Sequence, residues 1–111
     1  MSARSALWRS ASVFAALGDR TRLALVERLC EEGPSSISHL CRGVAMTRQG
    51  ITKHLEILAD AGLLDDRRRG RERIWQIRED RIEEARRCLD RISRQWDEAL
   101  GRLREFVERK P

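Results

Sequence analysis

Apolar residues recur along the first part of the chain at separations of one, three or four residues. The first such run contains Leu7, Trp8, Ala11, Phe14 and Ala15. Because these separations place side chains on one face of an α-helix, the run predicts a first helix over residues 5–17 that ends at Gly18.

The next apolar run predicts a second helix over residues 19–32. The positions that share one face, and are therefore expected to point inward, are Leu23, Val26, Leu29 and Cys30. Asp19 is a suitable N-cap, because its carboxylate accepts hydrogen bonds from the unpaired backbone N–H groups of the first turn. Gly33-Pro34 ends the helix.

A short helix and a longer one follow, separated by a turn. Ser35 or Ser36 can cap the short helix, which is predicted over residues 36–43. Thr47 can cap the longer helix, which is predicted over residues 47–61. Its inward positions are spaced at i, i+4 and i+7 and are Ile51, Leu55 and Leu58. Two helices joined in this way are typical of a helix-turn-helix motif.

Residues 63–78 change from the helical to the extended pattern. The run Ile74–Ile77 around Trp75 is rich in strand-forming residues, and Arg69-Gly70 supplies a bend before it. This segment therefore predicts a two-stranded β-hairpin, which would form a wing beside the helix-turn-helix motif.

Helical spacing returns over residues 80–109, where we predict the last helix. Its apolar positions alternate between intervals of three and four residues and are Ile82, Ala85, Leu89, Ile92, Trp96, Ala99, Leu103 and Phe106. This is a heptad-like seam, the pattern by which helices pair along their length. A helix of about thirty residues is roughly 45 Å long, so we expect a second copy of the chain to cover the seam.

The order of these elements, α-α-α-α-β-β-α, predicts a single domain over residues 1–111. The expected fold class is mainly α with a small β-hairpin. This is a winged helix-turn-helix architecture that dimerises through its terminal helices.

The net charge of +5 is unevenly distributed. Residues 79–111 contain nine basic and nine acidic side chains, so the whole excess lies in residues 1–78. A basic body beside a neutral arm fits a nucleic-acid partner. No apolar run approaches the roughly 20 residues of a membrane span, and the N-terminus lacks the pattern of a secretory signal, so we expect a cytoplasmic protein without membrane contact.

Side chains with catalytic or metal-binding chemistry are few and scattered. Cys30, Cys41 and Cys88 have no C-x-x-C spacing, which argues against a disulfide framework and a zinc knuckle. His39, Cys41 and His54 are the one conceivable ligand cluster, and a stable transition-metal site needs three or four converging ligands. The Ser, His and Cys residues form no nucleophile motif, so we expect no enzyme, no cofactor and no metal.

The exposed side chains on the first turns of the 47–61 helix are suited to reading DNA. We expect contacts from Thr47, Arg48, Gln49, Thr52, Lys53 and His54. Arg48 suits guanine O6/N7 and Gln49 suits adenine N6/N7, because each side chain can form a bidentate pair there. Thr47 has the alternative role of a helix cap. His54 either donates to a phosphate or packs against the neighbouring helix.

The predicted hairpin is rich in arginine, and guanidinium groups bind backbone phosphates or a narrow minor groove. Because side chains alternate between the two faces of a strand, only some of these arginines can face DNA. We expect contacts from Arg67, Arg69 and Arg71, chiefly from the last two at the tip. The alternative is a charged hairpin whose edge is merely protected from aggregation.

Taken together, these features resemble the ArsR/SmtB family of bacterial winged helix-turn-helix repressors. The residues that carry the resemblance are Phe14–Leu23 with Val26 and Leu29, Ile51–Leu55 through Leu58, Ala61–Leu64, and the Arg-Gly wing. The resemblance implies a homodimeric repressor whose first and last helices pair the subunits. It would read a palindromic double-stranded DNA operator with half-sites about 34 Å apart. The expected dimer interface consists of Leu7, Trp8, Ala11, Leu89, Ile92, Trp96, Ala99, Leu103 and Phe106.

Many members of that family sense metals through a Cys-rich third helix or through Asp and His on the last helix. This sequence departs from both patterns, because Gly43 stands where the second thiol would be and the last helix contains no His. The chain is therefore similar to a non-metal-sensing branch. The segments that mark this similarity are Met46–Gln49, the 67–73 wing with Trp75, and Trp96-Asp97.

The sequence does not identify an effector, and two alternatives stay open. One is a thiol- or metal-responsive regulator of the same fold, with Cys30, Cys41 or Cys88 as the switch. The other is a dimeric protein-interaction module that keeps the fold but does not bind DNA. Loss of operator binding on oxidation would favour the first, and equal binding to specific and scrambled duplexes would favour the second.

Overall fold

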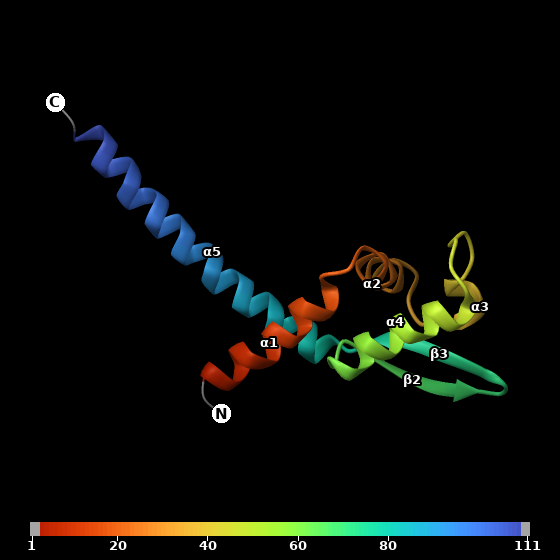
Figure 1. Ribbon diagram of the computed structural model, residues 1–111. Coiled ribbons are helices and arrows are strands. Elements are labelled where there is room, and N and C mark those ends of the chain that lie inside the picture. The colour runs from red at the N-terminus through yellow and green to blue at the C-terminus, as the bar shows by residue number, and fades with distance from the viewer. Residues whose placement is uncertain (1–2, 110–111) are drawn as a thin grey trace.

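The computed structural model describes residues 3–109 (Figure 1). Within them the elements are, in chain order, α1 (Ala3–Leu17), α2 (Arg20–Glu32), β1 (Ser35–Ser36), α3 (Ile37–Leu40), α4 (Arg48–Asp60), β2 (Leu64–Arg69), β3 (Glu72–Ile77) and α5 (Glu79–Glu108). The predicted fold class, mainly α with a small β-hairpin, is confirmed.

The hairpin of β2 and β3 carries a third strand that the sequence pattern did not reveal. β1 pairs antiparallel with β3, with Ser35 opposite Trp75 and Ser36 opposite Ile74. The strand order is β1-β3-β2, so β3 is central and the segment between α2 and α3 is attached to the wing. The expected two-stranded wing is therefore part of a three-stranded sheet in the described part of the chain.

The third helix is shorter than the range 36–43 expected for it. It begins at Ile37, because Ser36 is extended and its hydroxyl accepts a hydrogen bond from the backbone N–H of His39 at 3.2 Å. It ends at Leu40, and residues 41–43 form a turn. The first helix of the helix-turn-helix motif is thus little more than one turn long.

One hydrophobic core joins all five described helices and the sheet. Its buried members are Val13, Ala16, Leu25, Leu29, Ile37, Leu40, Ile51, Leu55, Leu58, Leu63, Leu64, Trp75 and Ala85. The predicted inward side of α4 is confirmed, since Ile51, Leu55 and Leu58 are completely buried. Trp75 is likewise a buried core residue.

The inward face predicted for α2 is wrong in part. Leu23 is 53% exposed and Cys30 is exposed, whereas Leu25 is only 3% exposed and packs in the core beside Leu29. Leu23 and Leu25 lie roughly 200° apart around a helix of 3.6 residues per turn. The apolar pattern alone therefore does not decide whether Leu23 or Leu25 packs in the core.

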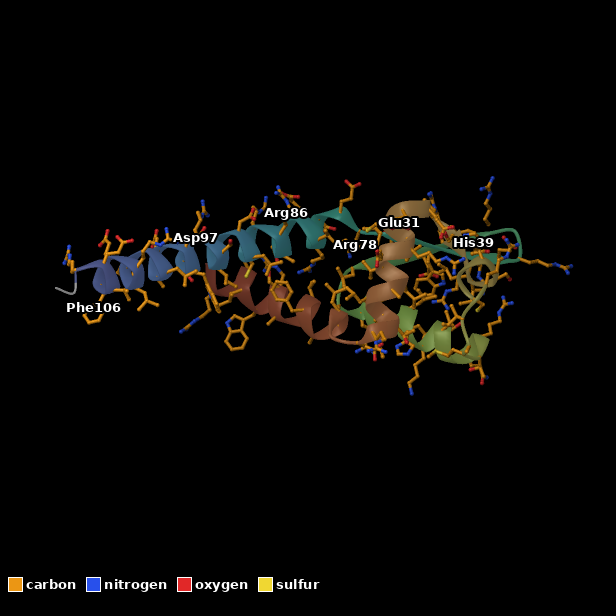
Figure 2. All side chains as sticks on the ribbon, turned by 90° about the horizontal axis from the view of Figure 1, so that it is seen from above. Glu31, His39, Arg78, Arg86, Asp97 and Phe106 are labelled. Atoms are coloured by element: carbon orange, nitrogen blue, oxygen red, sulfur yellow. The ribbon has the colours of Figure 1, made fainter. Side chains whose placement is uncertain are left out.

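The molecule is elongated because α5 projects from the body. Its radius of gyration is 18.7 Å, whereas a compact chain of this length has about 13 Å. Figure 2 shows α1 beside the first part of α5, and the stretch from Asp97 to Phe106 extending beyond α1. Among the described helices, none is long and apolar enough to cross a membrane.

A bidentate ion pair fastens α1 to α5. Arg9 Nε donates to Glu84 Oε1 at 2.8 Å, and Arg9 Nη2 donates to Glu84 Oε2 at 2.9 Å. The Arg9 hydrogen bonds hold the pKa of Glu84 below its ordinary value. Bidentate Arg–carboxylate pairs fix orientation as well as distance, so this pair helps to set the angle at which α5 leaves the body.

We expect Glu84→Gln to lower the Tm at pH 7 and to lower it less at pH 3. The pKa of Glu84 is lowered in the folded protein, so the ion pair stabilises the fold above the ordinary glutamate pKa of 4.5. Its contribution is lost as the pH falls through the lowered pKa. Thermal unfolding between pH 7 and 3 measures this. Glu83→Gln, which removes a pair with Arg86 within one helix, is the control. A Tm difference that stays constant with pH would contradict the expectation.

Candidate nucleic-acid interface

Thr47 caps α4 and sets where the exposed face of this helix begins. Its Oγ1 accepts a hydrogen bond from the backbone N–H of Gly50 at 3.0 Å. A Cβ at residue 50 would lie 3.0 Å from Met46 Cγ and 3.2 Å from Thr47 Oγ1, closer than side chains normally approach. Glycine at this position therefore lets the cap and Met46 pack against the first turn.

The exposed side of α4 forms one shallow depression. Its lining consists of Arg48, Gln49, Thr52, Lys53 and Glu56. The Thr52 hydroxyl donates to the backbone carbonyl of Arg48 at 2.9 Å, and Arg48 Nη1 donates to Ser38 Oγ of the neighbouring α3 at 3.3 Å. Four of the six residues expected to read DNA thus lie together. Glu56, which the sequence did not single out as a DNA contact, lies among them.

His54 lies on the side of α4 that faces α2. Its Nδ1 is 3.2 Å from Arg22 Nη1 and 3.9 Å from Asp19 Oδ2. A guanidinium only donates, so Nδ1 accepts from Arg22 and the ring hydrogen resides on Nε2. Arg22 also donates to the carbonyl of Ala16 at 2.6 Å. Of the two roles that the sequence left open for His54, the packing contact is the one observed.

Arg28 of α2 fastens the helix-turn-helix motif to the body. It donates to the backbone carbonyls of Leu40 and Arg42 at 3.2 and 3.1 Å, and to Glu32 at 2.8 Å. Glu32 also contacts His39 of α3 at 3.0 Å. The hydrogen bonds from Arg28 and His39 lower the pKa of Glu32. Sequence reasoning missed Arg28; its only signal was the i, i+4 spacing to Glu32.

The tip of the wing is a two-residue turn, Gly70-Arg71, between β2 and β3. Gly70 has φ +66°, which belongs to the left-handed region. A glycine at the first central position of a two-residue hairpin gives the type II′ turn, whose twist matches that of the flanking strands. Arg71 is therefore presented at the extreme end of the hairpin, where it is exposed.

The other wing arginines divide between the two faces of the hairpin. Register places Arg67 opposite Ile74 and Arg69 opposite Glu72 on one face, while Arg68 lies on the face of Trp75. Arg67 Nη2 donates to Gln76 Oε1 at 3.2 Å, so its guanidinium points back along the sheet. Arg69 remains exposed near the tip.

One arginine connects the wing to α4. Arg73 Nε donates to Asp66 Oδ2 at 2.6 Å, its guanidinium lies 4.4 Å from the centre of the Trp75 ring, and its Nη1 is 3.7 Å from Glu56 Oε1. The hydrogen bond that Arg73 donates to Asp66 raises the pKa of Arg73. The exposed depression of α4 and the wing therefore form one continuous surface.

The cysteines and histidines lie in separate environments. Cys30 is exposed, Cys41 is half-buried and Cys88 is buried. His39 contacts Glu32 and His54 contacts Arg22. Within residues 3–109, no three His, Cys, Asp or Glu side chains are grouped so that they could hold a metal ion.

The chain is similar to known helix-turn-helix regulators. Residues 17–67 match the helix-turn-helix domain family. HTH-type transcriptional regulator Rv2034 of Mycobacterium tuberculosis is 34% identical over 93 residues, which cover 84% of this chain and 83% of the relative. A solved structure of an ArsR-like transcriptional regulator from Rhodococcus sp. RHA1 is 33% identical in sequence. The match covers 94% of this chain and 97% of the regulator's chain, with a TM-score of 0.75. The chain belongs to the ArsR family.

As a member of the ArsR family, the protein is a DNA-binding transcriptional regulator with a winged helix-turn-helix fold. The expectation that it is not an enzyme is confirmed, since the similar proteins are transcriptional regulators. A further solved structure is the homodimeric winged helix-turn-helix domain Mb0332 of Mycobacterium bovis, described as a possible ArsR-family regulator. It is 25% identical and covers 92% of this chain and 93% of its own, with a TM-score of 0.63.

Proposed function

We propose that this ArsR-family regulator is a homodimeric repressor of a palindromic operator. Each protomer would place α4 in a major groove and its wing on the flanking backbone, and the bound dimer would occlude the promoter. The observation that carries the proposal is the contact between Glu56 and Arg73, which joins the polar depression of α4 to the basic wing. One continuous surface of the protein can thus bind a DNA groove and the phosphates that flank it.

Dimerisation is supported by apolar side chains left exposed on α1 and α5. Trp8 and Trp96 are each 67% exposed and Phe106 is 65% exposed. Contiguous exposed apolar surface of this kind marks an interaction site, and the similar Mb0332 domain is homodimeric. The proposed interface comprises Leu7, Trp8, Ala11, Leu89, Ile92, Trp96, Ala99, Leu103 and Phe106, together with the exposed Leu100 and Val107.

The side chains proposed to contact DNA have distinct roles. Arg48 and Gln49 read bases, because both lie at the exposed start of α4. Lys53, Arg69 and Arg71 bind phosphates, because all three are exposed and positively charged. The remaining candidates orient the others or add weaker contacts, and these are Thr47, Thr52, His54 and Arg67.

We expect Arg48→Ala and Arg69→Ala to weaken DNA binding in different ways. Arg48→Ala should relax the preference at one base position, where a bidentate pair contributes about 1–3 kcal/mol. Arg69→Ala should weaken binding to all sequences alike and, because the homodimer loses one phosphate contact from each protomer, reduce the salt slope by about 2. Selection of bound sites from random duplexes, followed by affinity measurements at several salt concentrations, tests both. Wild-type affinity in both variants, or selected sites without two-fold symmetry, would overturn the proposal.

A further inference from the structure

Glu56 is an acidic side chain on a surface that is otherwise suited to a polyanion. It lies in the α4 depression with Arg48, Gln49, Thr52 and Lys53, and its side chain is 53% exposed. It is four residues after Thr52 and three after Lys53, so it shares their helix face. A carboxylate at this place is repelled by phosphates, and its presence needs a compensating interaction.

The wing supplies part of that compensation through Arg73. This guanidinium is fixed on one side by Asp66 at 2.6 Å and on another by the Trp75 ring at 4.4 Å. Its Nη1 then lies 3.7 Å from Glu56 Oε1. Because Trp75 is buried in the core, Arg73 is anchored to the rigid part of the sheet. Arg73, which belongs to β3, thereby holds Glu56 of α4 at the surface proposed to face the groove.

We propose that Glu56 is a specificity-determining residue that selects cytosine at one position of each half-site, with Arg73 as its positioning residue. A carboxylate only accepts hydrogen bonds. In the major groove, cytosine presents its N4 amino group as a donor, whereas adenine places the acceptor N7 beside its own amino group and guanine presents two acceptors. A carboxylate can therefore accept a hydrogen bond from cytosine without lying beside an acceptor atom of the same base.

This inference rests on the proposed placement of α4 in the major groove, and its test uses glutamine as a matched replacement. Glu56→Gln keeps the shape but adds a donor, and an amide suits adenine N6/N7. We expect sites selected by the parent to be enriched about ten-fold for cytosine at one position per half-site. Glu56→Gln should shift that position to adenine, and Glu56→Ala should leave it without preference.

The matched control is Glu72→Gln, which removes the same charge from the wing at an exposed position outside the depression. Both Gln variants should gain affinity for all duplexes through reduced repulsion, but only Glu56→Gln should change the selected base. Arg73→Lys keeps the charge and loses the planar, forked geometry of the guanidinium. It should therefore weaken the base preference at the half-site position assigned to Glu56 and at no other position.

The outcomes separate two failures. If the parent selects a symmetric site and Glu56→Gln selects the same bases, the role of Glu56 is wrong while the proposed function stands. If the parent selects no sequence at all, the proposed function is wrong and the role of Glu56 fails with it. A change at several positions in Glu56→Gln would show that the substitution disturbs α4 as a whole, which also overturns the assignment.

Discussion

Leu103→Glu is expected to separate the two protomers and to lower the affinity for a two-half-site operator by about 100-fold. Leu103 is 58% exposed on the projecting part of α5, and its helical spacing from the exposed Trp96 and Phe106 places the three on one face. A charge within an apolar seam that a second chain covers loses its hydration without gaining a partner. The loss in affinity follows because two linked half-site contacts exceed a single one by about 10²–10⁴-fold.

Gly101→Glu provides the matched control for this substitution. It adds the same charge to the same helix, roughly 200° around from Leu103, and a Cβ at Gly101 meets no atom within 4 Å. Light scattering after size exclusion gives the mass of each variant, and titration of a symmetric duplex gives its affinity. A Leu103→Glu protein that remains dimeric would exclude this stretch of α5 from the interface. Dissociation of both variants would point to a general effect of charge.

The elements that follow a long local pattern could be predicted from the sequence. The inward side of α4 repeats over several turns in Ile51, Leu55 and Leu58, and the seam of α5 repeats over nearly four heptads. Local periodicity specifies such faces because apolar side chains at these spacings recur on one surface of the helix. The turn at Gly70 was also readable, because a tight hairpin needs a residue that accepts positive φ.

Features created by contacts between distant segments could not be predicted. β1 is only two residues long, too short for a period-2 pattern, and its partners Trp75 and Ile74 are remote in sequence. Arg28 and Arg73 appear in the sequence as ordinary charged residues. Their roles follow from carbonyls, rings and carboxylates that the fold brings to them. The sequence therefore predicted the components of the proposed DNA surface, while the links that orient them required the structure.

Leu25→Ala is expected to lower the free energy of unfolding by about 2–5 kcal/mol, the usual cost of such a truncation in a core. Leu25 is 3% exposed and packs against the cluster that holds α4. Since domains of this size have a total stability of roughly 5–15 kcal/mol, the variant should be partly unfolded at elevated temperature. DNA binding should then decline together with the folded fraction.

Leu23→Ala is the natural comparison, because it deletes the same atoms two residues away on the same helix. Leu23 is 53% exposed, so its truncation should cost about 1 kcal/mol or less. Denaturant unfolding at one fixed protomer concentration measures both, since the stability of a dimer depends on concentration. An equal decrease in the free energy of unfolding in the two variants would mean that Leu23 is buried in the assembled protein. The face of α2 that the sequence pattern favoured would then be buried by a second chain, while Leu25 is buried by the core of its own chain.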